Sequence, residues 1–203
     1  MTPSPALDSL RASTALAHAR LESQLAVAAP GATRATYLEY IQDMHGWLRA
    51  FEQQLWSAPW PAEVEAASRA GKLEWIECDL ASAGIPAAGI SALPRPAFAP
   101  DLARQASRFG LAYVIEGSQL GTKELGRRLR AQLGDWEPRW LQGYGAATGS
   151  KWRGFLHALE RHVRTPQEIN EACAAAAAGF ASLAEWFEQC RAQRAAIAET
   201  SET

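Results

Sequence analysis

Residues that favour helices dominate this chain from end to end. Alanine, leucine, glutamate and arginine are frequent, whereas valine and isoleucine, which favour strands, are scarce. No run of residues alternates convincingly between apolar and polar types, as a half-buried strand would. Apolar residues instead recur at intervals of three and four, most clearly at Tyr37, Tyr40, Ile41, Met44, Leu48 and Phe51. The sequence therefore predicts an all-α protein of about six to eight helices.

Prolines, glycines and capping residues indicate where the predicted helices end. A proline-rich segment without periodicity, 84–100, predicts a loop, and a glycine-rich segment, 136–149, predicts a turn-rich connector. Six helices are expected at about 8–27, 33–56, 62–82, 101–133, 150–163 and 165–195. The termini, about 1–8 and 196–203, are expected to fray. Because neither a repeat nor a linker divides the chain, we expect one domain over residues 1–203.

Composition restricts the compartment and the partners. The chain has 20 basic and 22 acidic side chains, which give a net charge of −2. It therefore lacks the excess positive charge that is typical of proteins that bind nucleic acid. Neither a signal-peptide pattern nor a long apolar run occurs, so no membrane span is expected. Three cysteines, an odd number without CxxC spacing, argue against a disulfide framework or a zinc site. A globular cytoplasmic protein is the expectation.

His18, in the first predicted helix, is the clearest candidate ligand. It lies three residues before Leu21 and seven before Leu25, so its imidazole is expected to point inward. Glu22 follows one turn later, where a carboxylate can accept the second ring N–H of a metal-bound histidine. Arg11, two turns earlier, could meet an anionic group of the same ligand. The alternative explanation of these residues, which is favoured for a lone histidine, is a hydrogen-bonded core histidine beside a solvated charged edge.

A pair of glycines forms the second constellation. Gly117 and Gly121 are four residues apart and share one face of the helix predicted over 101–133. The face without side chains could admit another helix or a planar ligand. Ser118 offers a hydroxyl at this groove, and Tyr113 supplies a polar group one turn earlier. Close packing between helices is the alternative explanation.

Two segments together resemble the heme oxygenases. The stretch LRASTALAH at 10–18, followed by Glu22, is similar to the proximal helix of that family. The stretch YVIEGSQLG at 113–121 is similar to the distal helix of its bacterial members. Both segments match in order and separation, and the similarity extends over most of the chain. The resemblance implies a single-domain heme oxygenase-like bundle of helices.

The resemblance assigns roles on both sides of a bound heme. It implies that His18 is the axial iron ligand and that Glu22 holds its ring. It also implies that the backbone at Gly117 and Gly121 covers the opposite face of the porphyrin. Ser118 would stand beside the water that delivers a proton, at a position where animal-type members have an aspartate.

Other side chains resemble those that meet the heme propionates, namely Arg11, Tyr113, Arg153 and His157. An arginine suits a carboxylate because its guanidinium can donate two parallel hydrogen bonds. The remaining histidines, His45 and His162, are expected at the surface or at a helix end.

The activity that the resemblance implies uses heme as both cofactor and substrate. With oxygen and electrons from a reductase or ferredoxin, the family cleaves the macrocycle to biliverdin, carbon monoxide and ferrous iron. The biliverdin could serve iron acquisition or supply a bilin-using phytochrome. Two other interpretations stay open: a non-catalytic heme carrier or sensor, and a helical interaction protein on the same fold.

Overall fold

The computed structural model describes residues 5–201, and every regular element in this range is helical. Its α-helices are α1 Pro5–Gln24, α2 Arg34–Arg49, α3 Glu52–Ser57, α4 Lys72–Ser82, α5 Ala87–Ser91, α6 Gln105–Leu133, α7 Arg139–Gln142, α8 Thr148–His162 and α9 Pro166–Ser201. Short 3-10 turns complete the described elements: η1 Ala26–Ala28, η2 Ala62–Val64, η3 Ala66–Ser68 and η4 Gly145–Ala147. The all-α prediction is confirmed, with nine α-helices in the described range.

One predicted helix is interrupted, and another begins later than predicted. The helix expected over 33–56 breaks before α3, because Phe51 has φ −153° and ψ −11°, outside the helical region. The helix expected over 62–82 begins only at Lys72, after Gly71 adopts a left-handed φ of 91°. Apolar spacing did not reveal the break at Phe51, because a brief interruption leaves much of the periodic pattern in place.

Two other regions contain more helix than predicted. The segment 84–100 contains α5, and α9 continues to Ser201 instead of ending near residue 195. The expectation that the two termini fray stays a prediction, and residues 1–4 and 202–203 lie outside the described range.

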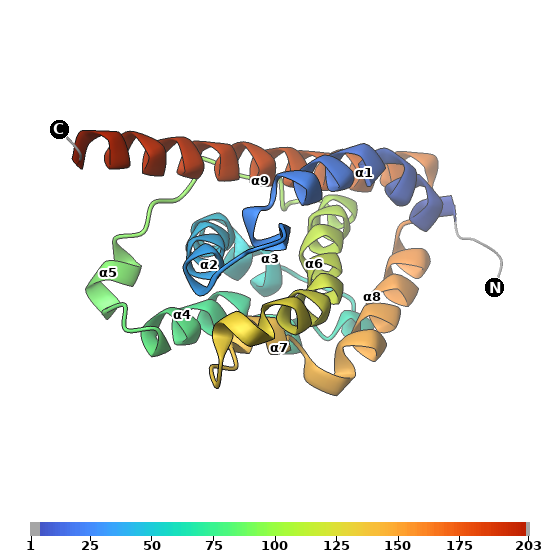
Figure 1. Cartoon of the computed structure of the whole chain (residues 1–203). Coiled ribbons are helices and arrows are strands. Elements are labelled where there is room, and N and C mark those ends of the chain that lie inside the picture. The colour runs from blue at the N-terminus through green and yellow to red at the C-terminus, as the bar shows by residue number, and fades with distance from the viewer. Residues whose placement is uncertain (1–4, 202–203) are drawn as a thin grey trace.

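The long helix α9 organises the packing of its neighbours. In Figure 1, α1 lies alongside α9 at the top of the view, and α6 lies below them and contacts α9. Helices α6 and α9 approach so closely that a Cβ on Gly110 would collide with the carbonyl group of Ala172. A Cβ on Gly179 would likewise lie 3.1 Å from a methyl carbon of Leu111. Glycine at these two positions permits the close contact between the helices.

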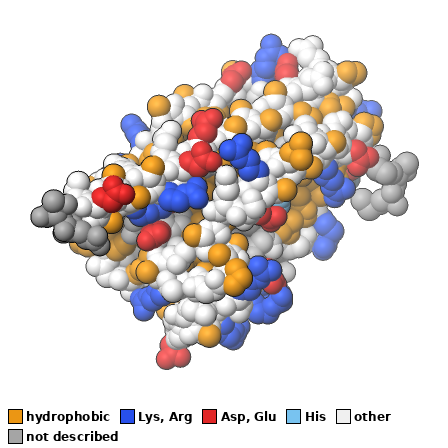
Figure 2. Space-filling view, turned by 45° about the horizontal axis from the view of Figure 1, so that its top comes forward, with side chains coloured by type: hydrophobic (Ala, Val, Ile, Leu, Met, Phe, Trp, Pro, Cys, Tyr) orange, Lys and Arg blue, Asp and Glu red, His pale blue; other side chains and the backbone are white. Residues whose placement is uncertain are grey.

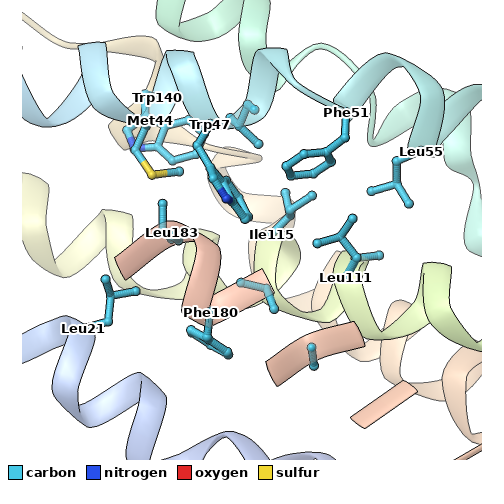
Figure 3. Packing of buried hydrophobic residues seen from close by; sticks show 14 of the residues in the cluster. Leu21, Met44, Trp47, Phe51, Leu55, Leu111, Ile115, Trp140, Phe180 and Leu183 are labelled. Atoms are coloured by element: carbon cyan, nitrogen blue, oxygen red, sulfur yellow. The ribbon is translucent and has the colours of Figure 1, made fainter. Parts of the chain in front are cut away.

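The hydrophobic core fills the space between α2, α3, α6 and α9. Figure 3 shows Trp47 and Phe51 pointing toward Leu111 and Ile115 of α6, with Leu183 of α9 nearby. All five side chains are buried, and each such burial contributes about 1.5 to 3 kcal/mol to the free energy of folding. This core buries one face of α6, and the opposite face of the helix lies nearer the surface.

None of the helices between residues 5 and 201 combines the length and the apolar character that crossing a lipid bilayer requires.

Candidate functional site

Three helices meet around Tyr113. Tyr113 lies on α6, and Thr14 and Arg11 of α1 are near enough to its side chain to lower its pKa. Its ring centroid is 5.5 Å from that of Trp152 on α8. Burial raises the pKa of Tyr113, while the charge of Arg11 and the contact with Thr14 oppose that shift. The structure thus brings Arg11 and Tyr113 together. Gly117 follows Tyr113 by one turn on α6, and His18 follows Thr14 by one turn and Arg11 by two turns on α1.

His18 lies at the edge of the interface between α1 and α9. Its side chain is 54% exposed, so the prediction of an inward-pointing imidazole was wrong. Leu10 and Leu21 occupy the buried face of α1, and the His18 ring packs edge-on against Phe180 at 5.7 Å between centroids. Nδ1 lies 3.5 Å from Oε2 of Glu22, which confirms the predicted proximity of these two side chains. Nε2 makes no hydrogen bond within the described part of the chain, so this nitrogen is free to bind a ligand.

Gly117 and Gly121 do not serve close packing within the described structure. A Cβ on Gly121 would meet no atom within 4 Å, and one on Gly117 would make only an ordinary contact of 3.7 Å with Trp152. At Gly110, by contrast, an added Cβ would collide with backbone of α9. The packing explanation therefore fits Gly110, whereas the other two glycines leave open space beside α6. Leu120, 45% exposed, adds an apolar side chain to this half of the helix.

Ser118 is half-buried, and its hydroxyl already has a partner. Oγ donates a hydrogen bond of 2.7 Å to the carbonyl oxygen of Ile115 in the same helix. The oxygen can still accept a hydrogen bond from water through its free lone pair. Ser118 can therefore orient a water molecule while its own proton is held by α6.

Arg153 and His157 are exposed on α8. The guanidinium of Arg153 lies along its own helix, since a Cβ on Gly149 would be 3.4 Å from Nη1. Across residues 5–201, neither side chain forms a hydrogen bond or ion pair with α1 or α6. The structure does not join these two residues to the junction at Tyr113. On the face shown in Figure 2, hydrophobic side chains lie interspersed with Lys and Arg side chains.

A buried ionic cluster behind α6 was not predicted. Glu116 accepts hydrogen bonds of 2.8 Å from Nζ of Lys72 and from the hydroxyl of Tyr144, and it also pairs with Arg69. Glu52 accepts the backbone N–H of Lys72 at 2.8 Å. Burial lowers the pKa of Lys72, and the negative charge of Glu116 opposes that shift. The available signal was a glutamate directly after an apolar run, 111–115, where a solvated charge is out of place.

The other histidines divide between the core and a helix end. His45 is 1% exposed, and its Nε2 lies 3.2 Å from Oε1 of Glu77, so the expectation of a surface position was wrong. Helix α2 is covered by α4 on this side, which no local pattern reveals. His162 ends α8 as expected and lies 2.8 Å from Oε1 of Glu63. Between residues 5 and 201, no three side chains of His, Cys, Asp or Glu gather as a metal site.

The fold and this junction define an all-α protein in which α1, the helix of His18, lies near α6, the helix of Gly117 and Gly121, at Tyr113. The model of the heme oxygenase family matches residues 4–189. A protein named heme oxygenase from Xanthomonas campestris pv. campestris (strain 8004) is 29% identical over 174 residues, covering 79% of this chain and 91% of that protein. The chain therefore belongs to the heme oxygenase family, and this membership supports a heme-degrading function in general.

Proposed function

We propose that this protein cleaves heme, with oxygen and an electron donor, to biliverdin, carbon monoxide and ferrous iron. The observation that carries the proposal is the open face of α6, where a Cβ on Gly121 would meet no atom within 4 Å and one on Gly117 would meet only Trp152, at 3.7 Å. Gly117 follows Tyr113 by one turn on α6, and His18 follows Thr14, which lies near Tyr113, by one turn on α1. Family membership supports the same assignment.

The proximal side suits an iron ligand. Nε2 of His18 would bind the iron, while Glu22, 3.5 Å from Nδ1, would accept the second ring N–H and fix the ring plane. The exposure of the imidazole leaves room for a large planar ligand beside α1. When bound, heme supplies the iron at which oxygen is reduced, and its own macrocycle is the substrate.

The distal side would act through backbone and one hydroxyl. Because Gly117 and Gly121 carry no side chain, α6 can approach the porphyrin and leave little room for bulkier molecules. Ser118 would accept a hydrogen bond from a water molecule and hold it for proton delivery. Arg11 and Tyr113 would bind propionates at the junction of α1 and α6. Further propionate contacts would come from Arg153, after leaving its position beside Gly149, and from His157.

The reaction requires a partner, because heme cleavage consumes electrons that no side chain supplies. A reductase or ferredoxin in the cytoplasm would supply them. The biliverdin would serve iron acquisition or become the chromophore of a phytochrome.

A hemin titration followed by reduction in air tests this function. The parent protein should bind one hemin with a histidine-ligated spectrum, and reductant should convert it to biliverdin identified by chromatography. His18→Ala should lose that spectrum, whereas His162→Ala, the matched control at the end of α8, should keep it.

Each contrary outcome has a defined meaning. Hemin binding without loss of the Soret band under reductant and oxygen would indicate a carrier or sensor. Absence of binding would indicate a helical interaction protein. An unchanged Soret band in His18→Ala would contradict the ligand assignment.

A further inference from the structure

The buried ionic cluster contacts α6 at Glu116, the residue directly before Gly117. The Glu116 cluster consists of Arg69, Lys72, Glu116 and Tyr144. The side chains of Arg69, Lys72 and Glu116 are each no more than 1% exposed. Nζ of Lys72 also donates a hydrogen bond of 2.7 Å to the Tyr144 hydroxyl. That hydroxyl in turn donates a hydrogen bond of 2.8 Å to Glu116. Each charge or hydroxyl of the cluster therefore has a partner within it.

Stability alone does not account for such a cluster. Removing a charged side chain from water costs several kcal/mol per ion, and well-packed apolar residues are often as stabilising as a buried ion pair. A buried ion pair does, however, specify one arrangement of its elements when its hydrogen bonds are directional. The Glu116 cluster meets this condition, which points to a role in placing α6.

The partners of Glu116 come from segments far away in the sequence. Arg69 follows η3, Lys72 begins α4, and Tyr144 precedes η4. The guanidinium of Arg69 also donates hydrogen bonds to two backbone carbonyl oxygens, that of Val64 at 2.5 Å and that of Lys151 in α8 at 3.0 Å. The cluster thus ties α6 to both α4 and α8.

The following turns of α6 lack a comparable polar tie. The amide nitrogen and oxygen of Gln119 are buried and have no hydrogen-bond partner in the described structure. The Thr122 hydroxyl bonds to the carbonyl oxygen of Gln119 in the same helix at 2.9 Å. Along this face of α6, the charged connection closest to the open glycines is therefore at Glu116.

We propose that Glu116 is a positioning residue, which through Arg69, Lys72 and Tyr144 sets how the segment Gly117–Gly121 lies over the heme. The inference rests on the proposed function for its ligand, but the tie itself exists without any ligand. If it is correct, breaking the cluster should loosen α6 specifically beyond residue 116. A uniform loss of stability would not produce that pattern.

Hydrogen exchange in the heme-free protein measures this directly. Glu116→Gln keeps the size of the side chain and removes its charge. Amides of residues 117–126 should exchange at least about tenfold faster, whereas amides of 106–112, held against α9, should change much less. The matched control is Asp43→Asn, which breaks the 2.7 Å ion pair between α2 and Arg194 of α9 and should leave 117–126 unchanged relative to other helices.

The carbon monoxide complex of the hemin-loaded, reduced protein gives a second readout. In Glu116→Gln, the C–O stretching band should broaden or split, since α6 no longer holds one position over the ligand, and Asp43→Asn should keep the parent band. Tyr144→Phe removes one hydroxyl from the cluster while retaining its charges, and it should produce a smaller change in the same direction. It carries the test if Glu116→Gln fails to fold.

Two outcomes would overturn the positioning role. One is exchange at 117–126 that matches the parent in every folded cluster variant. The other is exchange that rises equally in all helices, which would make the cluster a general contributor to stability. Failure of the parent to bind hemin would instead refute the proposed function, and the exchange measurement needs no heme.

Discussion

Replacing Gly121 by valine separates a ligand-facing glycine from a packing glycine. A Cβ at this position would meet no atom within 4 Å, so we expect none of the overpacking that usually costs about 1 to 3 kcal/mol. Valine also has a higher helix propensity than glycine, by about 0.3 kcal/mol or more. Since about 1 kcal/mol shifts the Tm of a domain of this size by roughly 2 to 4 °C, the Tm of the heme-free variant should stay within that interval of the parent.

The same substitution should impair the reaction. The two methyl groups would project into the open space beside α6, where the proposed function places the porphyrin and oxygen. A displacement of about 1 Å at a reacting centre can cost on the order of 100-fold in rate, so oxygen-dependent loss of the Soret band should slow by about 10 to 100-fold. Gly121→Ala, with a smaller side chain, should show a smaller loss.

Gly110→Val is the matched control in the same helix. Its side chain would collide with the backbone of Ala172, so this variant should be strongly destabilised. Circular dichroism melts give the Tm of each heme-free protein, and absorption spectra give hemin affinity and turnover. Normal turnover by Gly121→Val with a large fall in Tm would show that Gly121 serves packing. Normal turnover with an unchanged Tm would remove this residue from the distal side altogether.

The remaining predictions concern the histidine partner, the propionates and a buried titrating group. Glu22→Ala should still bind hemin but weaken the iron–histidine stretch in resonance Raman spectra, with about a 10 to 100-fold loss of affinity or turnover. If both the stretch and the turnover match the parent, Glu22 is an ordinary surface charge. Arg11→Ala and Arg153→Ala should change the ratio of biliverdin isomers separated by chromatography, because propionate contacts set the rotation of the heme, and unaltered ratios and hemin affinities would exclude both residues from the site. Burial lowers the pKa of His45 below its usual 6.5, so below that pH the unfolded state binds a proton that the native state excludes. The free energy of unfolding in urea should therefore fall as pH drops from about 7.5 to 5.5, by up to about 1.4 kcal/mol per pH unit from this group, and an equal slope in His45→Gln would assign the loss to other residues.

Local features of the sequence predicted the helical class and part of the site. Apolar spacing reports which face of a helix is buried, and this pattern survives without knowledge of the neighbours. The approach of Glu22 to His18 was predictable because residues four apart always lie on one face of a helix. The breaks before α3 and α4 were not, because they depend on backbone angles at Phe51 and Gly71.

Tertiary packing alone decided what these residues face. Helix α9 packs against α1, whose buried residues include Leu10 and Leu21, whereas His18 is 54% exposed although its spacing matched the apolar stripe. Gly110 and Gly121 are the same residue type in one helix, yet only the first meets a neighbouring backbone. The partners of Glu116 lie 28 to 47 positions away in the chain, and a buried charge acquires them only when separate helices assemble around it.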